Sequence, residues 1–403
     1  MKILVIAGYC PRDNHSAALS HNAYVDGFVK LGHKVDLICY SEKGFQIDEE
    51  MTIPVIENKY EYDGLSLYEK LSMKNRPIVS DSTENEHNEG EDCVSLKSRI
   101  INFTKKTIRG MYGIYNPSIV WFQRSKHFKT DINYDCVVSM SYPQVSHLVA
   151  NYLKKKRRVQ AKKWIQLWED PWSMDLGNAD GMKKCLKPEN KLLNEAEDIV
   201  YVSPITLIHQ QELFPNNKNK MRWCPLASYY TAEEKDYTGY TENYYGYFGD
   251  YSPNIRNLKP FYNVAVERNL NVDICGSPSD LFPSKNNVKI YPRLPLGELK
   301  QHEDKANIVI CLFNLGGGQI PGKIYQLAAT NKTILAILDG PEDEQKIIRD
   351  YFEKFNRFVF CQNNEKSISE AIDRIENNDL GGVSNKPIDD FSVEKVAKML
   401  LGD

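Results

Sequence analysis

The sequence predicts an α/β protein of two Rossmann-like domains, each built on a doubly wound parallel sheet, that face one another across a cleft. The chain has 403 residues, which is more than one typical hydrophobic core organises. Short apolar runs alternate with helical patterns in both halves, which is the order of right-handed β–α–β units. The alternation stops once, at residues 224–243, where the segment CPLASYYTAEEKDYTGYTEN has no steady hydrophobic period. We therefore predict a domain boundary at this segment.

Five apolar runs predict the strands of the first domain, which we assign to residues 1–225. The run KILVIAG is followed by a loop and by a helical pattern from about residue 16 to residue 31, which ends at Gly32. The run HKVDLICY then completes the first β–α–β unit. The other three runs, YDCVVSMS, KWIQLWED and DIVYVS, are apolar almost throughout, as expected for strands that are buried on both faces.

Residues 44–96 interrupt this pattern, and we interpret them as an insertion. Within it, the segment DSTENEHNEGED at residues 81–92 has no apolar face and predicts a mobile acidic loop. Residues 97–115 then predict a helix that mixes isoleucine, methionine and tyrosine with lysine and arginine, and a basic run, LKKKRR, follows at 153–158. Such a helix is typical of contact with an anionic membrane. The alternative is a core-facing helix with a solvated basic edge.

Six further apolar runs predict the strands of the second domain, which we assign to residues 244–388. These runs are YYGYFGD, NVDICG, NVKIYPR, NIVICLFN, TILAILD and RFVFC. Helices are predicted at 255–269, 321–330, 342–356 and 366–377. The final segment, residues 389–403, predicts an amphipathic helix with no obvious place in the second sheet. Ligands of such sheets bind beyond the carboxyl ends of the strands, so we expect a ligand in the cleft between the domains.

The composition excludes several classes of function. A net charge of −3 gives no reason to expect nucleic acid as a partner. The nine cysteines include no pair at C-x-x-C spacing, which excludes a zinc knuckle and a redox-active pair, and we expect buried free thiols in a reducing cytoplasm. No cleavable signal follows the first strand, and no apolar run approaches the roughly 18 residues of a membrane span. The sequence thus predicts a cytoplasmic protein.

The segment LFNLGGGQIPGKIYQLAATNKTIL, residues 312–335, predicts a phosphate site. It follows a buried strand and opens a helix with glycines, where unpaired N–H groups and the helix dipole attract anions. Its spacing is that of a P-loop, but Ile324 stands where Ser or Thr would hold magnesium. We therefore favour a metal-free diphosphate cradle over an ATPase loop. In this cradle Lys323 and Gln326 share one helix face and Arg256 supplies a second cation. The alternatives are solvated side chains on ordinary helices.

Four segments, in their order along the chain, resemble the GT-B-fold glycosyltransferases of family 4. The stretch KILVIAGYCP with GFVKLGHKVDLICY resembles the opening strand, loop and return strand of the family, and KWIQLWEDPWS resembles its W…DPW strand end. The stretches EAEDIVYVSP and PGKIYQLAATNKTIL resemble a later strand and the donor-binding motif. The likeness covers nearly the whole chain apart from residues 44–96. It implies a C-terminal helix, residues 389–403, that crosses back to the first domain.

The resemblance implies transfer of a sugar from a nucleoside-diphosphate sugar to a glycan or lipid-linked acceptor, with retention of configuration, in the synthesis of a surface polysaccharide or lipopolysaccharide. It implies neither a cofactor nor a metal, and the chain has no Asp-x-Asp pair, the manganese site of the other main glycosyltransferase fold. The protein would act in the cytoplasm, in peripheral contact with the inner face of the membrane. Two other interpretations stay open, a sugar-nucleotide epimerase of the same fold and a catalytically inactive partner or binding subunit.

The resemblance also implies roles for individual residues. The catalytic candidates are Asp170, Arg256 and Lys323. The candidates for donor binding are Gly249, Gly316, Gly317, Gly318, Gln319, Ile320, Pro321 and Gln326. The candidates on the acceptor side are Asn14, His15 and Trp172. The alternatives are a helix-capping role for Asp170 and an ordinary loop position for His15, while His147 is predicted on a helix face.

Two positions depart from the E-x7-E pattern of the family, because Gly318 and Gln326 stand where the glutamates would be. The amide of Gln326 can still bind ribose hydroxyls, whereas Gly318 has no side chain with which to contact the donor sugar.

Overall fold

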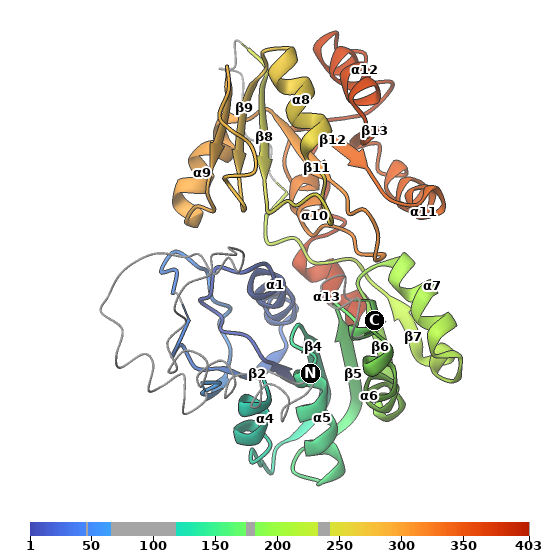
Figure 1. The fold of residues 1–403 in the computed structure, drawn as a ribbon. Coiled ribbons are helices and arrows are strands. Elements are labelled where there is room, and N and C mark those ends of the chain that lie inside the picture. Colours follow the sequence, from blue (N-terminus) through green and yellow to red (C-terminus); the bar gives the residue numbers. More distant parts are fainter. Residues whose placement is uncertain (46, 66–117, 175–181, 233–241, 403) are drawn as a thin grey trace, which may run out of the picture.

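The computed structural model consists of two α/β domains, one above the other in Figure 1. The residues that it describes are 1–45, 47–65, 118–174, 182–232 and 242–402. The predicted acidic segment, residues 81–92, and the predicted membrane-facing helix, residues 97–115, lie outside the described residues.

The first domain is built on a sheet of seven parallel strands in the order β3-β2-β1-β4-β5-β6-β7. The strands are β1 (Lys2–Ala7), β2 (Lys34–Tyr40), β3 (Asn58–Tyr62), β4 (Asn133–Ser141), β5 (Gln160–Trp168), β6 (Asp198–Tyr201) and β7 (Met221–Trp223). Five of them match the predicted apolar runs. The edge strands β3 and β7 escape prediction because NKYEY of β3 is largely polar and MRW of β7 is only three residues long.

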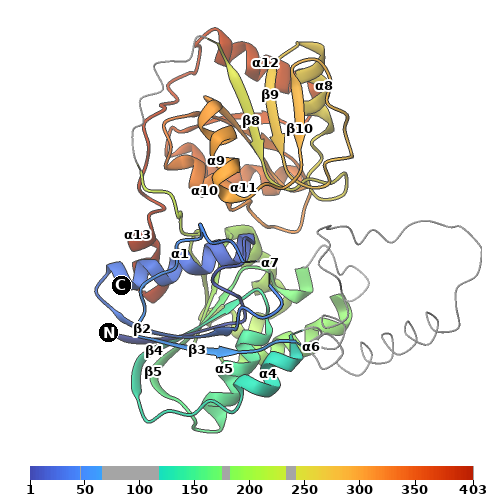
Figure 2. The same ribbon diagram turned by 90° about the vertical axis from the view of Figure 1, so that its left-hand side faces the viewer.

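Helices cover both faces of this sheet. They are α1 (Ser16–Lys30), α4 (Ile119–Ser125), α5 (Val145–Lys155), α6 (Met182–Glu195) and α7 (Pro204–Leu213), with the 3₁₀ turns η2 (Trp172–Met174) and η4 (Pro215–Lys220). The helix α1 lies on the face towards the second domain, and α4 and α5 lie on the opposite face (Figure 2). Successive side chains of β1 point to opposite faces of the sheet, and this explains why helices pack on both faces. Val5 belongs to one core with Phe28 of α1. Leu4 belongs to another core with Val149 of α5.

The second domain is built on a sheet of six parallel strands in the order β10-β9-β8-β11-β12-β13, which confirms all six predicted runs. The strands are β8 (Tyr244–Phe248), β9 (Asn271–Cys275), β10 (Val288–Tyr291), β11 (Ile308–Leu312), β12 (Thr333–Leu338) and β13 (Phe358–Gln362). The helices are α8 (Lys259–Glu267), α9 (Leu296–Lys305), α10 (Lys323–Ala328), α11 (Glu342–Glu353) and α12 (Glu365–Glu376).

Three helices of this domain differ from the prediction. The helix expected at 255–269 begins only at Lys259, because Ser252 and Arg256 first close a tight turn through two backbone hydrogen bonds. Arg256 therefore lies in a loop and not on a helix. The helix expected at 321–330 is shorter, since α10 starts at Lys323. The helix α9 escapes prediction because its sequence, LGELKQHEDK, has only two large apolar side chains.

The last helix, α13 (Val393–Leu401), leaves the second domain and packs against α1 of the first, as predicted (Figure 1). A Cβ atom added to Gly27 of α1 would lie 2.2 Å from the carbonyl oxygen of Val393, so the two helices meet at a glycine. The backbone N–H of Ser228 donates to the carbonyl of Phe391 at 2.7 Å, which joins the two chain segments that pass between the domains.

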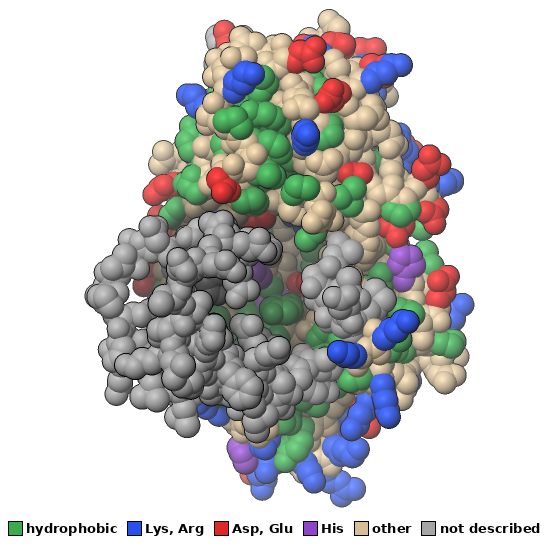
Figure 3. Space-filling view, in the orientation of Figure 1, with side chains coloured by type: hydrophobic (Ala, Val, Ile, Leu, Met, Phe, Trp, Pro, Cys, Tyr) green, Lys and Arg blue, Asp and Glu red, His purple; other side chains and the backbone are tan. Residues whose placement is uncertain are grey.

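Lys and Arg side chains gather over α5 and α6 of the first domain (Figure 3). The predicted basic run at 153–158 belongs to this surface. Within it, Lys154 pairs with Glu197 at 2.6 Å, whereas Lys156 and Arg157 are exposed.

Two further expectations, on membrane spans and on the cysteines, can be compared with the described residues. No helix there combines the length and the apolar character that crossing a bilayer requires. The eight cysteines among these residues are all buried and form no disulfide, as predicted. The ninth, Cys93, lies outside the described residues.

Candidate active site

A cavity of about 340 Å³ lies between the two domains. In each sheet the strand order changes direction beside one central strand, β1 in the first sheet and β8 in the second. Parallel sheets bind ligands at this switch point, beyond the carboxyl ends of their strands. Residues that follow β1, β5, β8 and β11 line the cavity, among them Asn14, Glu169, Gly249 and Asn314. The cavity thus occupies the position predicted for a ligand.

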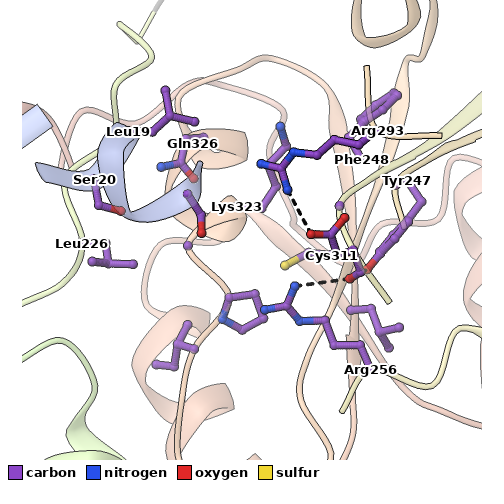
Figure 4. A pocket seen from close by; sticks show the side chains of 18 of the residues that line it. Leu19, Ser20, Leu226, Tyr247, Phe248, Arg256, Arg293, Cys311, Lys323 and Gln326 are labelled. Atoms are coloured by element: carbon purple, nitrogen blue, oxygen red, sulfur yellow. Dashed lines mark hydrogen bonds and ion pairs between the residues drawn. The ribbon is translucent and has the colours of Figure 1, made fainter. Parts of the chain in front are cut away.

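The two walls of the cavity differ in charge. The polar side chains on the wall of the first domain are Asn14, Ser16, Ser20, Glu169 and Asp170, and no Lys, Arg or His joins them among the described residues. The wall of the second domain carries three cations and one carboxylate, which are Arg256, Arg293, Lys323 and Asp250 (Figure 4). An anionic group of a ligand is therefore expected at the wall of the second domain.

Arg256 is fixed by neutral groups. Its Nε atom donates to Oδ1 of Asn314 at 2.7 Å, and a terminal nitrogen lies 3.4 Å from the backbone oxygen of Asp250. No ion pair joins this guanidinium to a carboxylate of the described chain. Its charge is therefore available to an anionic ligand, and its role in binding a diphosphate stays a prediction. Its position in a loop differs from the expected helix.

Lys323 lines the cavity but is paired within the protein. Its Nζ atom lies 2.6 Å from Oε1 of Glu303, and the hydroxyl of Tyr230 donates to the other carboxylate oxygen at 2.5 Å. Burial opposes the charge of Lys323, but the adjacent Glu303 carboxylate raises the pKa of this lysine well above its usual value. Burial likewise opposes the charge of Glu303, yet Lys323 holds the pKa of that carboxyl below its usual value. The pair is therefore ionised, and Lys323 is not the solvated cation of the alternative prediction.

Arg293 is a third cation that the sequence does not single out. It follows β10, where the run NVKIYPR predicts only a strand. One terminal nitrogen pairs with Asp250 at 3.0 Å, and the other donates to the backbone oxygen of Asn14 at 3.1 Å. Arg293 thus joins the two walls of the cavity.

The glycine run does not line the cavity, in contrast to the predicted cradle of Gly316, Gly317 and Gly318 amides. The carbonyl of Gly318 instead accepts hydrogen bonds from the hydroxyls of Ser203 and Thr206 in the first domain, at 2.5 and 3.0 Å. Gly317 and Gly318 have φ angles of 83° and 70°, which favour glycine. The run therefore binds the two domains to each other, and the cavity is lined by the residues that follow it.

Asp170 takes part in the same contact between domains. Its Oδ1 accepts a hydrogen bond from Nε2 of Gln319 at 2.5 Å, and its backbone oxygen accepts one from Gln144 at 2.6 Å. Both Asp170 and Gln319 line the cavity, as predicted. Asp170 therefore also connects the two domains, and its catalytic role stays a prediction.

The remaining donor-side candidates lie at the cavity. Gly249, Ile320, Pro321 and Gln326 all line it. Gln326 is 4% exposed, and its Oε1 atom has no hydrogen-bond partner among the described residues. The acceptor oxygen of this amide is therefore unpaired but enclosed, next to the cavity that Gln326 lines.

Only one of the three acceptor-side candidates lies at the cavity. Asn14 lines the cavity, but His15 and Trp172 do not. His15 caps α1 by accepting a hydrogen bond from the backbone N–H of Ala17, and Trp172 is buried in the core beneath α6. His147 is also buried, its Nδ1 lies 2.8 Å from the Ser139 hydroxyl, and burial lowers its pKa to about 3. The structure therefore brings Asn14 to the site and leaves the other three away from it.

Three charged residues of the site were not evident from the sequence. Glu169 stands beside the Asp170 that the sequence pattern favours, and Arg293 and Glu303 lie in segments with no motif. A helical prediction at 296–305 would have put Glu303 on a helix, but its contact with Lys323 depends on how that helix packs in the fold. Within the described part of the chain, no group of three His, Cys, Asp or Glu side chains is placed to hold a metal ion.

Solved structures of the same architecture cover almost the entire chain. TarM superposes with a TM-score of 0.60 at 9% identity, covering 100% of this chain and 98% of that one. Sucrose-phosphate synthase from Thermosynechococcus elongatus superposes with a TM-score of 0.55 at 10% identity, covering 100% and 94%. Anabaena HepE, in complex with UDP and glucose, superposes with a TM-score of 0.54 at 10% identity, covering 100% and 96%.

These likenesses identify the architecture as the GT-B glycosyltransferase fold, which confirms the predicted fold class. No protein-family model matches the sequence, and no curated protein matches it significantly.

Proposed function

We propose that this protein transfers a sugar from a nucleoside-diphosphate sugar to a hydroxyl group of an acceptor, with retention of configuration and without a metal ion. The observation that carries the proposal is the group of three cations on the second domain's wall of a GT-B interdomain cavity. Among them Arg256 has no carboxylate partner in the described chain, so its charge is open to a diphosphate.

The transfer forms a bond between the anomeric carbon and the acceptor oxygen and breaks the bond between that carbon and the diphosphate. The electron pair of the broken bond leaves with the diphosphate, which gains negative charge as the bond breaks and takes up the proton of the acceptor hydroxyl. Fixed, preorganised cations stabilise such charge more than water does. We assign this role to Arg256 and Lys323, with Arg293 at the junction of the two walls. The amide of Gln326, which lines the cavity, suits a ribose hydroxyl.

A thermal-shift panel of UDP-, GDP- and dTDP-sugars tests the proposal. A nucleotide sugar at 100 times its Kd stabilises the folded protein by about 2.7 kcal/mol. The proposal predicts a clear shift with at least one nucleotide sugar and a shift with the matching nucleoside diphosphate. A panel without any shift would contradict it and favour a catalytically inactive subunit. Release of free nucleotide with an isomerised sugar, and without any acceptor, would favour an epimerase.

We propose further that the acceptor is a glycan or lipid-linked molecule, met at an anionic membrane through the basic surface over α5 and α6. Four exposed lysines stand on α6, at Lys183, Lys184, Lys187 and Lys191, and α6 packs against α5, which the exposed Lys156 of the basic run follows. Each basic residue near such a surface contributes about 1 kcal/mol. Wild-type protein should therefore sediment with anionic vesicles at low salt, and replacing the four α6 lysines by glutamate should prevent it. Wild-type protein that stays in the supernatant would refute the membrane contact.

A further inference from the structure

The wall of the first domain carries a carboxylate that the transfer described above does not use. Glu169 follows β5, lines the cavity and is only 9% exposed. Its Oε1 atom is enclosed and lies 3.3 Å from Nε2 of His21, whereas its Oε2 atom is not enclosed and accepts no hydrogen bond from the described residues. Glu169 therefore presents its Oε2 atom as an unfilled acceptor to a ligand in the cavity.

His21 supports Glu169 without filling this acceptor. The ring of His21, on α1, is fully buried, and its Nε2 atom lies 3.3 Å from Glu169 Oε1 and 3.2 Å from the backbone oxygen of Ser141. Only the contact with Ser141 has the geometry of a hydrogen bond. The Ser141 hydroxyl also accepts the backbone N–H of Glu169 at 3.2 Å, and Tyr9 packs edge-on against the His21 ring with centroids 4.9 Å apart. The carboxylate is thus held in position while one oxygen stays open.

The neighbouring Asp170 is in a different situation. Its carboxylate is bound by Gln319 of the second domain, so it connects the two walls. Glu169, in contrast, makes no hydrogen bond or ion pair with the second domain in the described structure, and its ion-pair contact is with His21 of the first domain.

We propose that Glu169 binds a hydroxyl group of a sugar in the cavity, either of the transferred sugar or of the acceptor, and that Asp170 positions the domains. An ionised carboxylate only accepts hydrogen bonds, so its ligand must donate one. Phosphate is an anionic acceptor, and the three cations attract it to the opposite wall. A sugar carried by a diphosphate on that wall would extend its hydroxyls towards Glu169. This inference rests on the proposed function.

Calorimetry with a nucleotide and its matching nucleotide sugar tests the assignment. UDP and UDP-glucose serve as the probes, or the pair that gives the largest thermal shift. For Glu169→Ala, a bond to the donor sugar predicts about a tenfold loss of the affinity of the nucleotide sugar relative to the nucleotide. Glu169→Gln keeps the side-chain shape and an acceptor oxygen but loses the charge, so its loss should be smaller. The matched control is Glu195→Gln, which neutralises an exposed carboxylate on α6.

A second measurement separates the two sources of the hydroxyl. If Glu169 binds the acceptor, the ratio between nucleotide sugar and nucleotide stays unchanged, and glucose or galactose binds about tenfold more weakly to the UDP complex of Glu169→Ala than to that of wild type. Folded Glu169→Gln and Glu169→Ala proteins that match wild type in both measurements would overturn the inference. Wild-type protein that binds no nucleotide sugar at all would instead overturn the proposed function, and this inference with it.

Discussion

Replacing Lys323 by methionine should destabilise the protein far more than replacing Lys323 and Glu303 together. The two side chains form a buried ion pair, with side-chain exposures of 21% and 9% and an N–O distance of 2.6 Å. Methionine in place of Lys323 leaves the buried Glu303 carboxylate without its ion-pair partner, and the Tyr230 hydroxyl still donates to it. Glutamine in place of Glu303 leaves the ammonium of Lys323 without its counter-ion.

The size of the effect follows from the burial of the pair. Removing one partner of a buried ion pair costs about 3–5 kcal/mol, whereas replacing both by neutral groups of similar volume is often close to neutral. Because Lys323 also borders the cavity, we expect about 3 kcal/mol for each single variant. For a domain of this size each kcal/mol lowers Tm by about 2–4 °C, so each single variant should melt roughly 6–12 °C below wild type. The variant Lys323→Met with Glu303→Gln should recover most of this loss.

Urea unfolding of the four proteins at pH 7 gives the coupling energy through a double-mutant cycle. A second series in acid tests the sign of the pH dependence. The pKa of Glu303 is held below its usual value in the folded protein, so its contribution is present above the unfolded pKa of about 4.3 and is lost as pH falls through the folded pKa. The stability difference between wild type and Glu303→Gln should therefore shrink below about pH 4. Additive effects of the two substitutions at pH 7, or a difference that grows in acid, would refute the buried ion pair.

Three other substitutions test the fold around the cavity. Gly27→Ala should lower Tm by several degrees, although alanine has the higher helix propensity, because the added Cβ would lie 2.2 Å from the carbonyl oxygen of Val393. An unchanged or raised Tm would disprove the close packing of α1 on α13. Gly318→Ala should destabilise the protein and weaken the domain contact, because Gly318 has φ near +70° and an added Cβ would lie within 3 Å of the first domain. In the control Gly316→Ala the added Cβ meets no atom, so Tm should stay within about 1 °C of wild type. Equal effects of the two substitutions in thermal unfolding would contradict this placement of the glycine run. Ile324→Ser completes the P-loop sequence motif, but Ile324 is fully buried, so the substitution should lower the free energy of unfolding by about 3 kcal/mol in urea and create no ATPase activity. Release of phosphate from ATP by this variant would show that our interpretation of the loop is wrong.

Much of the fold follows from local sequence patterns. Eleven strands appear in the sequence as apolar runs, and all but the edge strand β10 are largely buried in the structure because helices cover both faces of each parallel sheet. The strands β3 and β7 lie at sheet edges, where one side lacks a neighbouring strand and polar residues are tolerated. The sequence therefore carries little signal for them. The helix α13 could be placed only through the resemblance, since its amphipathic pattern does not say which domain its apolar side contacts.

The candidate site was predicted less completely than the fold, because side chains from distant segments determine it. The glycine run suggested an anion cradle from local rules, but its Gly318 carbonyl is bound by Ser203 and Thr206, more than 100 residues earlier in the chain. Lys323 was recognised from its motif, whereas its partner Glu303 lies in a helix with few apolar residues. Glu169 was overlooked because its neighbour Asp170 fits the family pattern.

The availability of Arg256 to a diphosphate is the centre of the account, and calorimetry of wild type and Arg256→Gln with UDP, GDP, uridine and guanosine tests it most directly. A charge-assisted hydrogen bond contributes about 1.5–3 kcal/mol, which corresponds to roughly 10- to 150-fold in affinity. Arg256→Gln should therefore weaken binding of the preferred nucleoside diphosphate by that factor and leave binding of its nucleoside nearly unchanged. Lys259→Gln, an exposed position three residues later that does not line the cavity, should leave both affinities unchanged. Wild-type protein that binds no nucleoside diphosphate, or an Arg256→Gln protein that loses nucleoside and nucleoside diphosphate affinity equally, would contradict the account.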